Sequence, residues 1–79
     1  MTERIDARGL LCPLPVLRLR KRLLDLPRGT RVTLLATDPA ALIDVPHFCA
    51  ESGHRLIASR QTVAGETEYT VERGPASGD

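Results

Sequence analysis

Apolar and polar residues alternate along this 79-residue chain in a way that predicts two helices and four strands. Between Pro13 and Leu26 the apolar residues recur at helical spacing, and charged residues cover the opposite side. We expect this first helix to end at the Pro27-Arg-Gly29 turn. Its apolar positions are Val16, Leu19, Leu23 and Leu26.

The strand-like segments are rich in β-branched residues and are bounded by turn residues. Leu35 lies between Leu34 and Ala36 and breaks the alternation, so this strand is expected to be buried on both faces. In the last segment Tyr69 and Val71 alternate with charged and polar residues, which indicates a half-buried strand. The four predicted strands are Glu3–Ala7, Arg31–Thr37, Arg55–Val63 and Glu66–Arg73, with Ala64-Gly65 joining the last two.

A second helical segment begins at Asp38-Pro39, where an aspartate cap precedes a proline at the first helical position. Pro46 interrupts this segment. We therefore expect one irregular turn, then a restart capped by Asp44, and an end at Gly53.

The order of elements is strand, helix, strand, helix, strand, strand. It predicts an α+β fold: a two-layer α/β sandwich in which two helices cover one face of a four-stranded mixed sheet. The length corresponds to a single domain over residues 1–79. Residues 74–79, Gly-Pro-Ala-Ser-Gly-Asp, have the composition of a frayed tail.

Composition favours a cytoplasmic protein. No segment has the length of apolar residues needed to span a bilayer, and the first residues are polar and charged rather than signal-like. In the cytoplasm Cys12 and Cys49 should be reduced, and two cysteines do not make a disulfide framework.

Charge is unevenly distributed although the net charge is only +1. Residues 1–31 carry eight basic and three acidic groups, whereas residues 32–79 carry three basic and seven acidic groups. This asymmetry favours docking of a polar partner near the N-terminal half, and a solvated helix face is the simpler interpretation. Direct nucleic-acid binding is not expected, because Phe48 and Tyr69 are the only aromatic residues. The basic residues that would attract such a docking partner are Arg18, Arg20, Lys21 and Arg22.

The run Cys12-Pro13-Leu14-Pro15 marks the start of the first helix. We expect Cys12 at the N-cap, Pro13 at the first helical position and Pro15 at the third, because prolines lose little where helix amides have no internal partner. The helix dipole then predicts a modest lowering of the Cys12 thiol pKa, with Leu14 as the one nearby amide free to donate.

Two further residues are expected to shape this stretch. Arg8 is the nearest cation in sequence and would favour a thiolate, and Gly9 allows a tight turn out of the first strand. A helix-start cysteine without any chemistry is the alternative. The chain has no histidine near Cys12 in sequence, no phosphate loop and no paired carboxylates, so it lacks the parts of a self-contained enzyme.

Other candidate residues are interpreted as structural. Asp38 and Asp44 are expected to cap helices, while Asp6 is expected to hold the Cys12 loop by accepting backbone amides. Cys49 shares apolar spacing with Leu42, Val45 and Phe48, which favours a core thiol over a resolving partner for Cys12.

A zinc site is not expected. His47, Cys49 and His54 have a spacing that matches no usual structural zinc pattern, and a fourth ligand is missing. His54 is expected at the junction between the second helix and the next strand.

Two runs of sequence resemble the TusA family of small sulfur carriers, also called SirA-like proteins. The first is Asp6-Ala-Arg-Gly-Leu-Leu-Cys-Pro-Leu-Pro15, and the second extends from Asp38-Pro39 through Asp44-Val-Pro46 to Gly53-His54. Together with the order of elements, the resemblance covers nearly the whole chain up to about Arg73.

This resemblance implies that Cys12 takes a sulfane sulfur as a persulfide from a cysteine desulfurase or a rhodanese and passes it to an acceptor protein. The sulfur would serve tRNA 2-thiouridine, sulfur oxidation or molybdenum-cofactor supply, and neither a metal nor a bound cofactor is required. Many members of the tRNA branch have an acidic residue between the prolines, where this chain has Leu14. Residues implied to shape the site are Asp6, Gly9, Pro13 and Pro15.

A different class of function is also open. The chain would then be a regulatory or interaction module in which the Cys-Pro-x-Pro run only starts a helix and the basic helix binds a partner.

Overall fold

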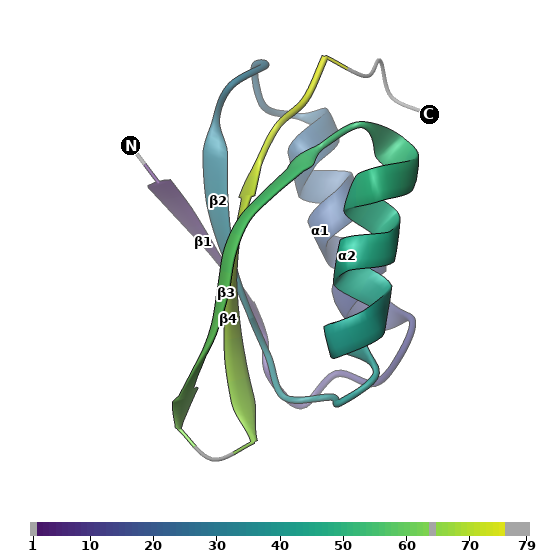
Figure 1. The fold of residues 1–79 in the computed structure, drawn as a ribbon, viewed down its shortest axis with the longest axis vertical. Helices are drawn as coiled ribbons and strands as arrows, with labels where there is room; N and C mark the ends of the chain where they lie inside the picture. Colours follow the sequence, from purple (N-terminus) through teal and green to yellow (C-terminus); the bar gives the residue numbers. More distant parts are fainter. Residues whose placement is uncertain (1, 64, 76–79) are drawn as a thin grey trace.

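The computed structural model describes residues 2–63 and 65–75. Two helices lie against one face of a single sheet, as Figure 1 shows. The elements follow the predicted order and agree with the predicted strand bounds to within a residue at each end. They are β1 (Thr2–Ala7), α1 (Leu14–Leu24), β2 (Arg31–Ala36), α2 (Ala41–Ser52), β3 (Arg55–Val63) and β4 (Glu66–Glu72).

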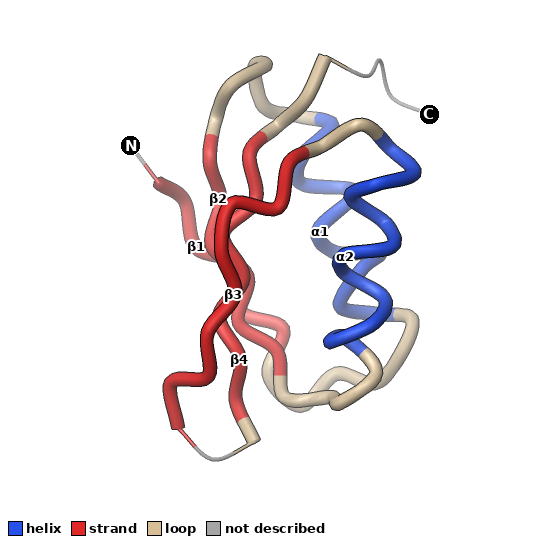
Figure 2. The backbone as a smooth tube through the Cα atoms, viewed as in Figure 1, coloured by secondary structure: helices blue, strands red, loops and turns tan. Residues whose placement is uncertain are grey.

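The sheet has the strand order β1-β2-β4-β3. β1 pairs with β2 in parallel, with Ile5 opposite Leu34, and the other two pairings are antiparallel. This mixed four-stranded sheet with both helices on one face confirms the predicted α+β sandwich. Parallel strands end at the same edge of a sheet, so the loops that follow β1 and β2 lie together, as Figure 2 shows.

The core fills the space between the helices and the sheet. Leu19 and Leu23 of α1 and Val45 of α2 are fully buried, as the helical spacing of apolar residues in α1 predicted. Val16 and Leu26 are partly buried and pack against the edge of this core. The sheet contributes Ile5, Ala7, Val32, Leu34, Ala36, Tyr69 and Val71.

β2 is buried on both faces, as predicted, although helices cover only one of them. Thr33 and Leu35 point to the other face and are still buried. Arg4 of β1 and Glu68 of β4 lie on either side of β2 and form an ion pair of 3.7 Å. Long charged side chains of this kind can cover apolar surface with their aliphatic parts.

α2 departs from the prediction because it is continuous from Ala41 to Ser52 and contains Pro46. The predicted restart at Asp44 is wrong. Proline removes one hydrogen bond here, and the carbonyl left without this donor belongs to Leu42, which is exposed. Gly53 ends the helix in a left-handed conformation with φ 80°, as predicted.

The chain after β4 is held against the rest of the fold at Gly74, the first residue of the predicted tail. Gly74 is buried and donates its backbone N–H to Nδ1 of His54 at 2.9 Å. A side chain at this position would collide with the carbonyl of Gly53, so the close approach requires glycine. The end of the predicted frayed tail, residues 76–79, lies outside the described residues, as does Ala64 of the predicted hairpin turn. No helix in the described ranges is long and apolar enough to cross a membrane.

Candidate functional site around Cys12

A tight turn leads from β1 to Cys12. The amide of Leu10 donates to the carbonyl of Ala7 at 3.2 Å, and Gly9 adopts a positive φ of 81°, as expected for a glycine at this turn. The Gly9 amide donates to Oγ1 of Thr37 at 2.9 Å, which ties the turn to the end of β2. The parallel pairing of β1 and β2 therefore brings the Cys12 loop onto the loop between β2 and α2.

Helix α1 starts one residue later than the sequence suggested. Pro13 is the N-cap residue and Pro15 occupies the second helical position, so Cys12 precedes the cap. The peptide bond between Cys12 and Pro13 is cis. The prediction of Cys12 at the N-cap, with prolines at the first and third helical positions, is therefore wrong by one residue. Both prolines still lie in the first turn, where missing amides are tolerated.

Two aspartates, Asp38 in the loop between β2 and α2 and Asp44 in the first turn of α2, hold Cys12 in place. The Cys12 amide donates to Oδ2 of Asp38 at 2.5 Å, and the Cys12 thiol donates to Oδ2 of Asp44 at 2.9 Å. Asp38 also accepts the Ala40 amide on Oδ1 at 3.1 Å, so one carboxylate organises both loops. Asp38 thus caps the turn before α2, whereas Asp44 caps no helix and contacts the sulfur.

The electrostatic environment of Cys12 is opposite to the one expected. The pKa of the Cys12 thiol is raised above its ordinary value, first because the thiol donates to the Asp44 carboxylate. Partial desolvation and the negative charges of Asp44 and Asp38 add to this effect. The prediction of a thiol pKa lowered by the helix dipole is therefore wrong for the protein alone.

Neither expected helper of a thiolate reaches the sulfur. The Leu14 amide donates to the carbonyl of Leu11 at 2.8 Å. The Arg8 guanidinium bonds both carboxylate oxygens of Asp6 at 2.9 Å and lies 3.6 Å from Glu66. These bonds hold the pKa of the Asp6 carboxyl well below its usual range. Asp6 accepts the Arg8 amide at 3.1 Å, so it stabilises the start of the turn rather than Cys12 itself.

Cys12 is exposed at one end of a cleft of about 370 Å³ between the start of α1 and the side of α2. Pro13, Val16 and Phe48 form its apolar part. Asp44, His47 and Glu51 of α2 are its ionisable residues besides Cys12. No lysine or arginine occurs among the described residues that line this cleft.

Four large apolar residues that are close in sequence to Cys12, or that lie just before its partner Asp44, are exposed. Leu11 and Leu14 flank Cys12 in sequence, and Leu42 and Ile43 precede Asp44 at the start of α2. Leu11 is 70% exposed and Ile43 is 75% exposed. A concentration of exposed apolar residues beside one reactive atom is typical of a surface that another protein covers. We call these four residues the apolar rim.

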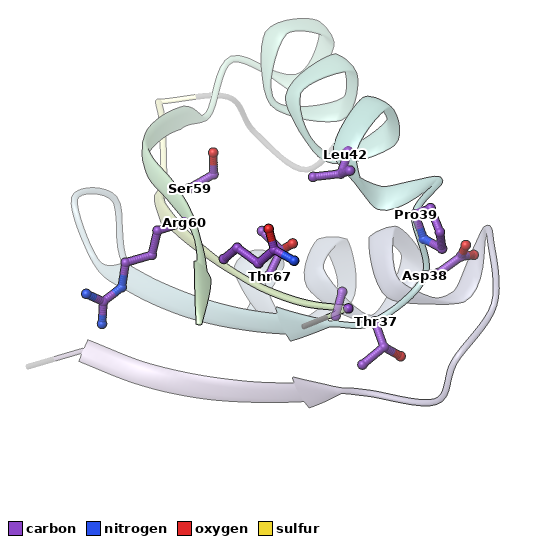
Figure 3. Close-up of a pocket in the computed structure, with 10 residues that line it drawn as sticks. Thr37, Asp38, Pro39, Leu42, Ser59, Arg60 and Thr67 are labelled. Carbon is purple, nitrogen blue, oxygen red and sulfur yellow. The ribbon is translucent and has the colours of Figure 1, made fainter. Parts of the chain in front are cut away.

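A second hollow, of about 230 Å³, lies on the other side of Asp38 between the start of α2 and the β3–β4 hairpin. Figure 3 shows Asp38 next to Thr37 and Pro39 at one end of this hollow, with Arg60 extending away from it. Its described lining includes neither cysteine nor histidine. The Cys12 cleft is therefore the candidate site.

The four basic residues of α1 do not form one surface. The Arg22 guanidinium bonds both carboxylate oxygens of Glu3 on β1, and Arg18 donates to the Asp6 carbonyl at 3.2 Å. Arg20 and Lys21 are exposed and make no ion pair within residues 2–63 and 65–75. Of the predicted docking set, Arg20 and Lys21 are thus the two with neither an ion pair nor a hydrogen bond of the side chain to another described residue.

Cys49 lies in the core at 2% exposure, and burial raises the pKa of its thiol to about 11. Its interpretation as a core thiol is confirmed. Leu42, which was expected to share its buried face, is exposed, because α2 begins at Ala41 and its buried stripe runs through Ala41, Val45 and Phe48.

The three residues considered for zinc lie apart. His47 is exposed beside Glu51, whereas His54 accepts the Gly74 amide and packs its ring against Phe48. Within the part of the chain that the structure describes, no three potential ligands form a metal-binding group.

Comparison with known proteins gives this site a context. The family model described as Sulfurtransferase TusA matches residues 3–73, which is most of the chain. The chain belongs to the TusA family. A TusA sulfur carrier protein of Pseudomonas savastanoi pv. phaseolicola is 39% identical over 71 residues, covering 90% of this chain and 83% of that protein.

Other TusA relatives agree in sequence and fold. A sulfur carrier protein TusA of Pseudomonas syringae pv. syringae is 45% identical over 69 residues, which cover 87% of this chain and 81% of that protein. The crystal structure of a SirA-like protein from Desulfitobacterium hafniense superposes with a TM-score of 0.81 at 29% identity. The superposed region covers 94% of this chain and 99% of the SirA-like chain.

Sequence reasoning missed Asp44 as a neighbour of the sulfur and the apolar rim as a surface. A partial signal for the rim was present: Ile43 falls outside the apolar spacing of Leu42, Val45 and Phe48, and Leu11 precedes the first helix. No local signal points to the contact between Asp44 and Cys12, because it joins the loop before α1 to the first turn of α2, 32 residues further along the chain.

Proposed function

We propose that this TusA-family protein carries a sulfane sulfur as a persulfide on Cys12 and relays it from one protein to another. The observation that supports this most directly is the exposed Cys12 sulfur, fixed by Asp38 and Asp44 within the apolar rim. A carrier needs its reactive atom presented at a rigid position that a partner's active site can reach. The buried Cys49 does not meet this requirement.

The transfer exchanges one sulfur–sulfur bond for another. The Cys12 sulfur attacks the outer sulfur of the donor persulfide, and the donor cysteine leaves. In net form, Cys12–SH and donor–S–SH become Cys12–S–SH and donor–SH, so atoms and electrons balance without a metal or an added oxidant. Discharge to an acceptor cysteine is the same exchange with the roles reversed.

The donor we propose is a cysteine desulfurase or a rhodanese, and the receiver is a cysteine of a downstream protein. The apolar rim provides the contact surface, and Arg20 and Lys21 on the adjoining helix attract an acidic partner. We keep the cytoplasm as the compartment, because a relay of this kind needs reduced cysteines. The final product, whether thiolated tRNA, an oxidised sulfur compound or molybdenum cofactor, depends on the receiver.

The resting thiol is not primed for attack, since its pKa is raised beside Asp44. A thiol of high pKa is a strong nucleophile once it loses its proton, but little of it is deprotonated near neutral pH. Loading is therefore expected to be slow with small persulfides and faster within a complex that excludes water and supplies a cation to Asp44.

Intact mass measurement tests the proposal. The protein is incubated with a cysteine desulfurase and cysteine and then weighed, with a rhodanese and thiosulfate as the second donor system. A gain of one sulfur atom that a reductant removes is expected for the wild type and for Cys49→Ser, but not for Cys12→Ser. Absence of any gain with both donors would overturn the proposal and favour an interaction module in which the Cys-Pro-x-Pro run only starts α1.

A further inference from the structure

The surroundings of Cys12 favour a neutral sulfur over a charged one. Asp44 accepts the thiol hydrogen at 2.9 Å, and Asp38 lies at the Cys12 amide. His47 and Glu51 of α2 face the same cleft, and α1 contributes only the apolar Pro13 and Val16. The nearest cation in sequence, Arg8, is bound to Asp6 and Glu66 instead.

The empty and loaded carrier meet these carboxylates differently. In the empty form the thiol is a donor, and Asp44 is a charged acceptor, which is the stronger kind of hydrogen bond. In the loaded form the inner sulfur has no hydrogen left to donate. The outer sulfur of a persulfide is more acidic than a thiol, so at neutral pH it is largely an anion. Asp44 therefore stabilises the empty form and repels the loaded one.

We propose that Asp44 weakens the hold of Cys12 on its sulfur and so biases this carrier toward delivery. The inference rests on the proposed function, because it concerns the equilibrium of the same transfer. In the exchange of Cys12–SH with a persulfide, the number of sulfur–sulfur bonds stays constant, and so the equilibrium reflects the surroundings of the two cysteines. A carboxylate that favours Cys12–SH over Cys12–S–S⁻ shifts this equilibrium toward the receiver.

A carrier without this carboxylate would load more completely and discharge less readily. A thiolate-stabilising site would have the opposite effect, since it would also stabilise the persulfide anion and retain the sulfur. The arrangement around Cys12 thus suits a protein that must give its cargo away, and Asp44 tunes the reaction through the reacting sulfur that it contacts.

The test is an equilibrium measurement with a small persulfide, so that no partner protein affects the result. The protein is mixed with glutathione persulfide and glutathione at fixed ratio and neutral pH, trapped with iodoacetamide, and weighed. Asp44→Asn keeps the shape and an acceptor oxygen but removes the charge. Its ratio of loaded to empty carrier should exceed that of the wild type by about two- to fivefold, as for a partly exposed charge pair.

Glu51→Gln is the matched control, because it removes one negative charge from the same cleft without a bond to Cys12. It should change the ratio far less than Asp44→Asn. Asp44→Glu keeps the charge and should stay near the wild type, and Asp44→Ser gives a second neutral variant with a smaller side chain. Thermal melts establish that each variant is folded.

The outcomes separate the two proposals. A wild-type protein that takes no sulfur from any donor overturns the proposed function. A wild type that loads normally, with neutral Asp44 variants at the same or a lower loaded ratio, overturns only the role of Asp44. An equal rise in Glu51→Gln would assign the effect to the total charge of the cleft and would also overturn it.

Discussion

The two cysteines of this chain lie near opposite sides of α2 and differ in almost every property that decides reactivity. Cys12 is exposed beside Asp44, whereas Cys49 is buried among apolar side chains. Both thiols have a raised pKa, but for different reasons: a hydrogen bond to a carboxylate at Cys12 and desolvation at Cys49. The first cause can be removed by a partner or by one substitution, whereas the second persists as long as the core is intact.

This difference shows that a pKa alone does not identify a working thiol. The raised pKa of Cys12 comes mainly from the Asp44 carboxylate, which a docking protein can neutralise. The raised pKa of Cys49 comes from burial and can be relieved only by opening the fold. Reactivity toward a partner therefore depends on what raises the pKa and whether it is reachable.

The largest effect should appear in alkylation of the native protein with iodoacetamide. Labelling of Cys49 requires opening of the core, so Cys12 should react about a thousandfold faster or more, as a stability of about 5 kcal/mol implies. Peptide mapping after timed quenching measures the two rates. Comparable rates in the folded protein would break the comparison, and labelling in urea, where both should react alike, is the control.

The next effect is on stability. Cys49→Ser places an unpaired hydroxyl in the core and should lower the free energy of unfolding by roughly 1–3 kcal/mol. Cys12→Ser keeps a donor for Asp44 at an exposed position and should change it by less than about 0.5 kcal/mol. Urea denaturation followed by circular dichroism gives both values, and a reversed order would contradict the assignment of the two sites.

A third prediction concerns the charged residues through which a partner would dock beside Cys12. Arg20→Glu combined with Lys21→Glu should slow sulfur loading from the donor protein by up to about tenfold at low salt, and by less at high salt. The matched control is Arg28→Glu combined with Arg31→Glu, which changes the net charge equally beyond the far end of α1. Equal rates for the wild type and both pairs would remove these residues from docking.

The smallest effect concerns the pH profile of Cys12 alkylation. Because the Asp44 bond raises the thiol pKa, the wild-type rate should climb with pH through a midpoint above that of an ordinary free cysteine. Asp44→Asn should move this midpoint to lower pH. The larger thiolate population outweighs the lower nucleophilicity of a less basic thiolate, so alkylation below the midpoint should be faster in this variant than in the wild type. An unchanged midpoint would contradict the assigned cause.

The sequence predicted the elements well because each has its own local signal. The apolar stripe through Leu19 and Leu23 and the doubly buried β2 both follow from periodicity. Errors occurred where prolines set the boundaries. At Pro13 and Pro15 the start of α1 was placed one residue too early, and Pro46 suggested a break in a helix that is continuous.

The position of Cys12 in the fold was predicted closely, but its electrostatic surroundings were not. The Cys-Pro-x-Pro run placed Cys12 at the start of α1, and its exposure agrees with a reachable sulfur. The local argument counted only the helix dipole and Arg8. It missed Asp44, which approaches from α2, and it missed that Asp6 engages Arg8. Contacts between segments far apart in the chain depend on the parallel pairing of β1 and β2. No local sequence pattern predicts whether such a contact brings a positive or a negative charge to Cys12.

The exposure of Cys12, with Cys49 buried, has a consequence for the order of events in the proposed relay. One sulfur would have to serve both the donor and the receiver, because the other thiol lies in the core. On that proposal we expect the two proteins to bind in turn, with the carrier leaving the first before it binds the second.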